Sequence, residues 1–167
     1  MQKKLLMIAV MAILGMAAAI AQPRAIGANV GSGVGFSYQH GFGESNMLDV
    51  AASIPVIYKG LGIGGHVTYD WIDPFGASVP WSGKGAWDWY MGVGGAGGAY
   101  GLFSSDAANY WYAGVAGHIG IEYNINHFNL SFDYRPCIGV DNVNDGQVGF
   151  GLNGLYGNIA IGLRYKF

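Results

Sequence analysis

The chain has 167 residues, of which 30 are glycine, 14% are aromatic and only 11% are charged. This length and composition suit one domain built from strands and tight turns better than a helical protein. With 8 Lys and Arg against 10 Asp and Glu, the chain lacks the basic surface that a nucleic acid would need. The single cysteine excludes an internal disulfide.

The first 21 residues have the features of an export signal. Two early lysines supply positive charge, residues 5–20 are apolar, and an Ala-Ile-Ala cleavage site ends at Ala21. The apolar run of 16 residues is shorter than the roughly 20 that a membrane-spanning helix needs, which disfavours a retained helical anchor. We expect a cleaved signal peptide over residues 1–21 and a mature domain over residues 22–167.

Apolar and polar side chains alternate through most of the mature domain. Ile159, Ile161, Leu163 and Tyr165 fall on one face of the last segment, opposite small or polar residues, as successive side chains of a strand do. The same pattern recurs between turn-like sequences and predicts eight strands. They cover approximately residues 25–39, 46–58, 61–71, 87–94, 111–123, 128–135, 147–152 and 158–167.

The region between the sixth and the eighth predicted strand is the hardest to interpret. Pro136 cannot donate a hydrogen bond to a neighbouring strand and should lie at a strand end or bulge. Residues 141–146 are typical of a turn, and Asn153-Gly154 predicts a tight hairpin into the last strand. The exact strand boundaries within residues 136–157 therefore stay open.

The positions of the charged residues distinguish the glycine-rich face of the predicted strands from the apolar face. Of 18 charged residues, two lie in the predicted signal and eight in turns or at strand ends, Arg24 and Asp141 among them. The other eight all fall on the glycine-rich face of their strands. They are Asp49, Asp70, Asp88, Glu122, Asp133, Arg135, Arg164 and Lys166.

This distribution favours a barrel in a membrane over a soluble one. A soluble barrel would need a charged outer surface, and its lumen would have to hold the tryptophans and most tyrosines. The opposite arrangement puts small residues and charges inside and bulky apolar residues against lipid, where a charge costs about 2–4 kcal/mol. The sequence therefore predicts an all-β fold, an eight-stranded antiparallel up-and-down transmembrane β-barrel.

Aromatic residues near the predicted strand ends suggest two belts at the membrane surfaces. With an even number of strands, both termini lie on the periplasmic side. The strand directions then predict an outer belt that includes Tyr69, Trp71 and Trp87, and a periplasmic belt that includes Tyr165 and Phe167.

Several segments resemble the small OmpA/OmpX-like outer-membrane barrel family. They are the glycine-rich residues 31–38, Ile119-Gly-Ile-Glu-Tyr123, Leu130-Ser-Phe-Asp-Tyr-Arg-Pro136 and the terminal Leu163-Arg-Tyr-Lys-Phe167. The resemblance implies a location in the outer membrane of a Gram-negative bacterium, contact with its lipid, and a C-terminal signal, Tyr165 and Phe167, read by the barrel-assembly machinery. It transfers little about activity, because the family includes adhesins, structural proteins and lipid A-modifying enzymes.

The inward polar residues form the main candidate site. Buried charges must be paired, so we expect a network that plugs the lumen and gives the protein a structural or surface-interaction role. A narrow pore along the same residues is the alternative. The predicted lumen network comprises His66, Asp70, Asp88, His118, Glu122, Asp133, Arg135, Arg164 and Lys166.

Other chemistry has less support. A lipid A-modifying hydrolase would need a nucleophile beside its base, but His127 and Ser131 are about 13 Å apart on an extended strand. No metal-binding or phosphate-binding motif occurs, so we expect no catalytic residue, metal or other cofactor. For an extracellular ligand of unknown identity, the best candidate is the long segment 73–84, with Pro74, Phe75, Pro80 and Trp81.

Overall fold

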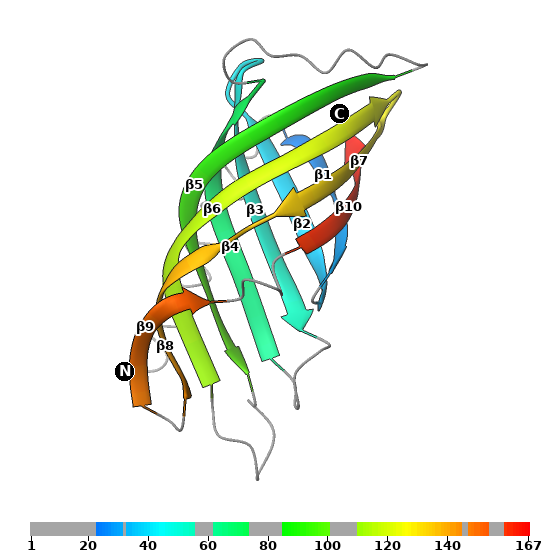
Figure 1. Cartoon of the computed structure of the whole chain (residues 1–167). Coiled ribbons are helices and arrows are strands. Elements are labelled where there is room, and N and C mark those ends of the chain that lie inside the picture. The colour runs from blue at the N-terminus through cyan, green and yellow to red at the C-terminus, as the bar shows by residue number, and fades with distance from the viewer. Residues whose placement is uncertain are drawn as a thin grey trace, which may run out of the picture.

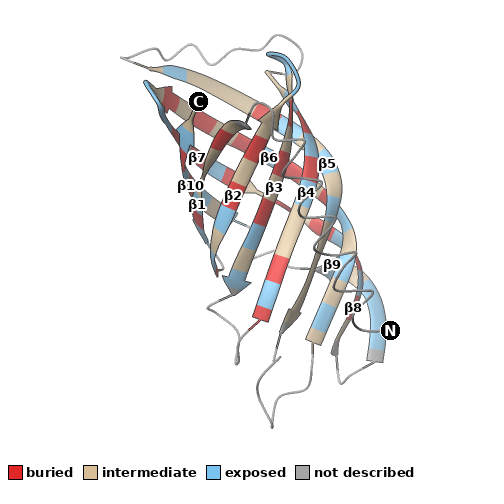
Figure 2. Ribbon diagram, turned by 180° about the vertical axis from the view of Figure 1, so that it is seen from behind, coloured by how far each residue is buried: buried red, intermediate tan, exposed pale blue. Residues whose placement is uncertain are grey.

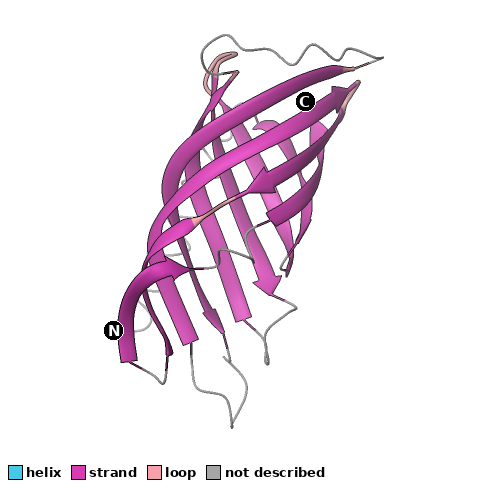
Figure 3. Cartoon of the chain, in the orientation of Figure 1, coloured by secondary structure: helices cyan, strands magenta, loops and turns pink. Residues whose placement is uncertain are grey.

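The computed structural model describes residues 23–31, 33–55, 62–73, 85–100, 110–144, 147–153 and 159–167. The predicted signal peptide lies outside these residues. The described chain consists of strands and short connections (Figure 3). Among these residues, no helix has the length and apolar character needed to cross a membrane.

Ten strands are present in the described chain (Figure 1). Their bounds are β1 Pro23–Gly31, β2 Gly33–Gly41, β3 Asn46–Pro55, β4 Gly62–Ile72, β5 Ala86–Tyr100, β6 Tyr110–Ile125, β7 Phe128–Tyr134, β8 Cys137–Asn144, β9 Gln147–Asn153 and β10 Ile159–Lys166.

Eight of these strands close into an antiparallel barrel, in the order β5-β4-β3-β2-β1-β10-β7-β6, with β6 paired back to β5. Tracing the paired residues around the barrel from Tyr112 on β6 returns to the same strand at Glu122. This displacement of ten residues tilts the strands strongly against the barrel axis. The predicted eight-stranded antiparallel barrel is confirmed.

The first predicted strand is wrong, because residues 25–39 belong to two strands. β1 and β2 form a hairpin in which Val30 pairs with Val34 across residues 31–33. Both valines point outward, so the hydrophobic alternation continues through the turn without a break in phase. The glycines at positions 31 and 33 were the turn signal that the alternation concealed.

The region after β7 also differs from the prediction. β7 and β8 both pair with β6, and Pro136 lies between them in the chain. The carbonyl of Pro136 accepts a hydrogen bond from Gly117 N at 2.8 Å. The predicted strand end at Pro136 is therefore confirmed. Asp141, however, belongs to β8 and not to a turn. β9 pairs with β8, whereas β10 pairs with β1 and β7, so the predicted hairpin at Asn153-Gly154 is wrong.

The extra hairpin at residues 31–33 reverses the direction predicted for the next strands. The turns at 42–45 and 126–127 consequently lie at the same end of the barrel as Phe167 (Figure 1). Asp73 and Gly85, which flank the predicted external loop, lie at this end too. We call this the C-terminal end. The loop was predicted to project from the end opposite the termini, and that placement is wrong.

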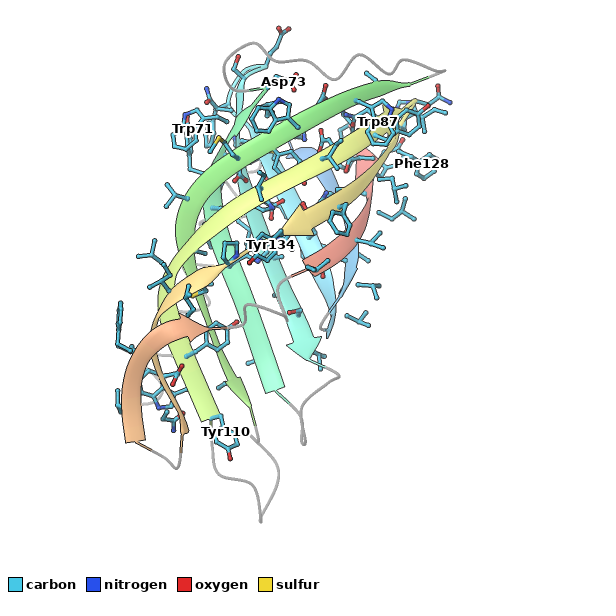
Figure 4. All side chains as sticks on the ribbon, in the orientation of Figure 1. Trp71, Asp73, Trp87, Tyr110, Phe128 and Tyr134 are labelled. Carbon is cyan, nitrogen blue, oxygen red and sulfur yellow. The ribbon has the colours of Figure 1, made fainter. Side chains whose placement is uncertain are left out.

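The outward aromatic side chains gather mainly at the C-terminal end. Trp71, Trp87 and Phe128 all lie there (Figure 4). Tyr165 contacts Phe128 and Phe167, with ring centroids 6.1 and 5.4 Å apart, respectively. The predicted separation of Tyr165 and Phe167 from the other aromatics is wrong, again because of the additional hairpin.

The outer face of the barrel is apolar and the inner face is polar, as the sequence predicts. Buried and exposed residues alternate along the strands (Figure 2). The apolar residues Phe36, Ile161 and Leu163 are 52–57% exposed on the outside. Of the eight charged residues on the glycine-rich faces, six are buried, and Asp88 and Lys166 are partly buried.

Glycines on the inner wall leave room for inward side chains of the neighbouring strands. A Cβ atom added to Gly120 on β6 would lie 2.5 Å from the ring of Tyr90 on β5. A Cβ atom at Gly92 would collide with the carboxylate of Asp70 on β4. These two glycines therefore allow Tyr90 and Asp70 to lie flat against the neighbouring strand.

We expect Gly120→Ala to lower the free energy of unfolding by about 1–3 kcal/mol, because the buried Tyr90 ring has little space to move. Urea unfolding followed by tryptophan fluorescence measures this effect. Gly151→Ala is the matched control, since its Cβ would meet no atom within 4 Å. Equal unfolding midpoints for the two variants would contradict this account of Gly120.

Candidate functional site

The candidate site is an ionic network in the lumen, supplied by the inward face of most barrel strands. Side chains two residues apart point to the same side of a strand, which brings Thr68 and Asp70 together on β4 and Ser131 and Asp133 together on β7. β3 adds Asp49, and β10 adds Arg164. Closure of the sheet places these side chains opposite one another.

Asp133 is at the centre of the network and is fully buried. Its carboxylate accepts hydrogen bonds from the hydroxyl groups of Ser131, at 2.8 Å, and Tyr90. It also lies 3.2 Å from His118 Nε2, 3.3 Å from Arg135 Nη2 and 3.5 Å from Arg164 Nη2. Both carboxylate oxygens therefore have donors, which offsets the cost of burying the charge.

Arg164 connects Asp133 to the other side of the lumen. Its guanidinium donates to the hydroxyl groups of Ser37 and Ser131, both at 2.7 Å. The same group donates to the side-chain oxygen of Asn129 at 3.2 Å and lies 3.6 Å from Asp49. A guanidinium with several donors in a fixed plane suits this position, because it can bridge partners from different strands.

Asp49 forms the opposite side of the network. Its carboxylate lies 2.9 Å from His66 Nε2 and accepts a hydrogen bond from the Gln39 amide at 3.1 Å. Arg135 Nη2 is 3.8 Å away. Arg135 is less well satisfied than Arg164, because its buried Nε and Nη2 atoms have no hydrogen-bond partner among the described residues.

A second ionic cluster lies nearer the C-terminal end of the barrel. The carboxylate of Glu122 accepts hydrogen bonds from the guanidinium of Arg24, one of them at 3.2 Å, and Asp88 lies 3.9 Å from the same guanidinium. The Asn124 amide donates to Asp88 at 2.8 Å and to Glu122 at 3.1 Å. Arg24 was assigned to a strand end by its position in the sequence, but it reaches into the lumen.

Most of the predicted lumen residues make direct contacts in these two clusters. His66, Asp70, His118, Asp133, Arg135 and Arg164 join the central cluster, and Glu122 and Asp88 join the second. Lys166 is partly buried on the same face of β10 as Arg164.

The predicted site omitted several residues that the structure brings in. The charge pattern of the sequence already put Asp49 on the polar, inward face, and this was reason enough to include it in the predicted network. The remaining residues are neutral or lie near a strand end, so nothing in the charge pattern marked them. They are Arg24, Ser37, Gln39, Thr68, Tyr90, Asn124, Asn129 and Ser131.

The other predicted groups fall outside this site. Pro74, Phe75, Pro80 and Trp81 lie outside the described residues. Tyr165 and Phe167 are exposed on the outer face, and the Tyr165 ring stacks on His127 at 5.4 Å. Ser131 is buried in the lumen, whereas His127 is exposed in its turn, so these two residues do not form a nucleophile and base.

The geometry describes oppositely charged side chains that pair with one another inside the barrel. Within the described ranges, no group of three or more His, Cys, Asp or Glu residues is arranged to hold a metal ion. Comparison with models of protein families, with curated proteins and with solved structures found no match.

We expect Arg164→Met to lower the free energy of unfolding by about 3–5 kcal/mol, because it leaves Asp49 and Asp133 buried with less compensation. Lys166→Met is the matched control on the same strand and face, and we expect less than about 1 kcal/mol from this partly buried group. Equilibrium urea unfolding measures both. Equal losses for the two variants would mean that Arg164 does not stabilise the network.

Proposed function

We propose that this chain is an exported, integral outer-membrane β-barrel protein of the OmpA/OmpX-like kind. Its lumen is closed by the ionic network, and its role is structural or one of surface interaction. The observation that carries the proposal is the reversed distribution of polar and apolar side chains between the interior and the outer surface.

Soluble proteins bury large apolar residues and seldom bury charges. Here the largest fully buried side chains are mainly polar, with Arg164, Tyr90, Met47 and Gln39 at the head of the set. Large apolar residues are exposed on every strand and reach 78% exposure at Phe150. An apolar surface all around the barrel is larger than the apolar patches that soluble proteins normally expose to water. A surrounding hydrocarbon phase would stabilise it.

The closed ring of strands also supports this environment. Away from water, every backbone donor and acceptor needs a partner within the protein, and a closed barrel provides one along all its strands. The aromatic residues at the C-terminal end, such as Trp71, Trp87 and Tyr165, suit the level of the lipid headgroups. Export by the predicted signal peptide accounts for delivery of the chain to this membrane.

The interior favours a plugged barrel over an open pore. Eight-stranded barrels have lumens that side chains can fill. The central cluster draws on β3, β4, β5, β6, β7 and β10, so it crosses the barrel from several sides. With both termini on the periplasmic side, the segments at the opposite end face the exterior, and we assign any surface interaction to that end.

Cell fractionation tests the location. We expect the mature protein, beginning at Gln22, in the outer-membrane fraction, and a compact band in mild detergent gels that migrates differently after boiling. The same experiment with Phe167 deleted tests the proposed assembly signal, for which we expect less folded protein in the membrane. Recovery of the cleaved wild-type chain as a water-soluble protein would overturn the proposal.

A charge on the outer wall separates the membrane barrel from a soluble one. Ile161 is 55% exposed on the outer face of β10. We expect Ile161→Lys to reduce the free energy of unfolding in lipid vesicles by about 2–4 kcal/mol, because the ammonium group would face hydrocarbon. In water the same exposed position would accept lysine at little cost.

The control for this substitution is Glu44→Lys in the exposed turn before β3. It changes the chain's net charge more than Ile161→Lys does, but at the barrel end, so we expect folding into vesicles to be unaffected. Equal stability of the wild type and Ile161→Lys in vesicles would argue against lipid at this face.

A further inference from the structure

Asp70 differs from the other fully buried acids of the two clusters in its cationic partner. Asp49, Glu122 and Asp133 each lie within 4.0 Å of at least one arginine. Asp70 is fully buried, and the only cationic group within this distance among the described residues is the imidazole of His118. A buried carboxylate without a positive partner is strongly unfavourable, so the charge of His118 decides whether Asp70 is stable here.

The two ring nitrogens of His118 both face carboxylates. Nδ1 lies 3.0 Å from each oxygen of Asp70, and Nε2 lies 3.2 Å from Oδ1 of Asp133. An ionised carboxylate only accepts hydrogen bonds, whereas a neutral imidazole has one donor and one acceptor nitrogen. Both contacts are satisfied together only when both nitrogens carry a proton.

The charge balance of the central cluster also favours a His118 ring with a proton on both nitrogens. Three carboxylates, those of Asp49, Asp70 and Asp133, face two guanidinium groups, those of Arg135 and Arg164. One positive charge is missing for neutrality. His66 is the other histidine in the cluster, but it needs a proton on only one nitrogen to donate to Asp49.

We propose that His118 is a doubly protonated imidazolium that ties β4 to β7 through Asp70 and Asp133, and that loss of its proton releases one of these ties. The lumen network then contains a pH-sensitive element in its centre. Histidine is suited to such an element because its charge changes with modest changes in its surroundings.

The groups packed around His118 determine what happens when the proton leaves. They are Asp49 from β3, His66, Thr68 and Asp70 from β4, Tyr90 from β5, Asp133 and Arg135 from the β7 edge, and Arg164 from β10.

A neutral His118 would leave these groups unevenly satisfied. Asp133 would keep its contacts with Arg135, Arg164 and Tyr90. Without a proton on Nδ1 of His118, Asp70 would keep only the hydroxyl of Thr68 among the described residues, at 3.1 Å. The one remaining ring proton therefore belongs on Nδ1, facing Asp70, and the contact to Asp133 is the one that breaks.

The competing arrangement is a neutral ring whose Nδ1 accepts a hydrogen bond from Thr68. The Thr68 hydroxyl lies 3.1 Å from Nδ1, so it could donate there instead of to Asp70. Asp70 would then have no donor among the described residues, unless its own carboxyl group were protonated. The two arrangements differ in the number of protons on the ring, which can be measured.

Nitrogen NMR of the 15N-labelled, folded protein in detergent micelles at about pH 7 tests the proposal. We expect both ring nitrogens of His118 to have the chemical shift of a protonated nitrogen. A shift typical of an unprotonated nitrogen at either position would overturn the proposal. The signals are assigned from their loss in His118→Gln, or by elimination with Gln variants of His40, His66 and His127 if that protein does not fold.

Thermal unfolding as a function of pH tests the consequence. We expect the unfolding temperature of the wild type to fall between neutral and alkaline pH, and this fall to be largely lost in His118→Gln. His66→Gln is the matched control from the same cluster and should keep the wild-type fall. The same pH dependence in wild type and His118→Gln would contradict the proposed tie.

This inference needs only the folded barrel in detergent, so its outcome is distinguishable from that of the proposed function. A chain found outside the outer membrane could still show the imidazolium, and an outer-membrane protein could show a neutral ring.

Discussion

The structure depends on the pairing of charges inside a closed sheet. The single residue Asp133 contacts side chains from β5, β6 and β10 as well as from its own strand. Arg164 donates to Ser37, which is 127 residues away in the chain. An unpaired charge in such a place would cost several kcal/mol. Closure of the barrel and neutralisation of the lumen therefore require each other, because the partners meet only when the last strand pairs with the first.

Small residues on the inner wall make this pairing possible. The Tyr90 ring and the Asp70 carboxylate lie against glycines on adjacent strands, and the Arg164 guanidinium lies against Gly162 of its own strand. A narrow barrel with bulky residues on both faces would have no space for them. The abundance of glycine is thus a packing requirement of the polar interior, and the apolar bulk is left to the outer face.

The differences between prediction and structure come from one kind of ambiguity. Alternation reports the face of each residue, but it does not report where the chain reverses. Val30 and Val34 pair across a hairpin and still keep the phase of a single strand. That turn, missed in the sequence, places Tyr69, Trp71 and the start of the segment after Asp73 at the end that holds both termini of the described chain, and not at the opposite end as predicted. The predicted count of eight held because β9 was counted as a barrel strand, whereas it pairs only with β8 among the described strands.

The sequence by itself determined the fold class, the outward and inward faces, and most of the charges that share the interior. It could do so because alternation with a period of two is a local property of extended chain. Only the tertiary structure decided which of those charges meet, how Arg24 enters the lumen, and why His118 lies between Asp70 and Asp133. Those contacts depend on the register between strands distant in sequence, which no local pattern specifies.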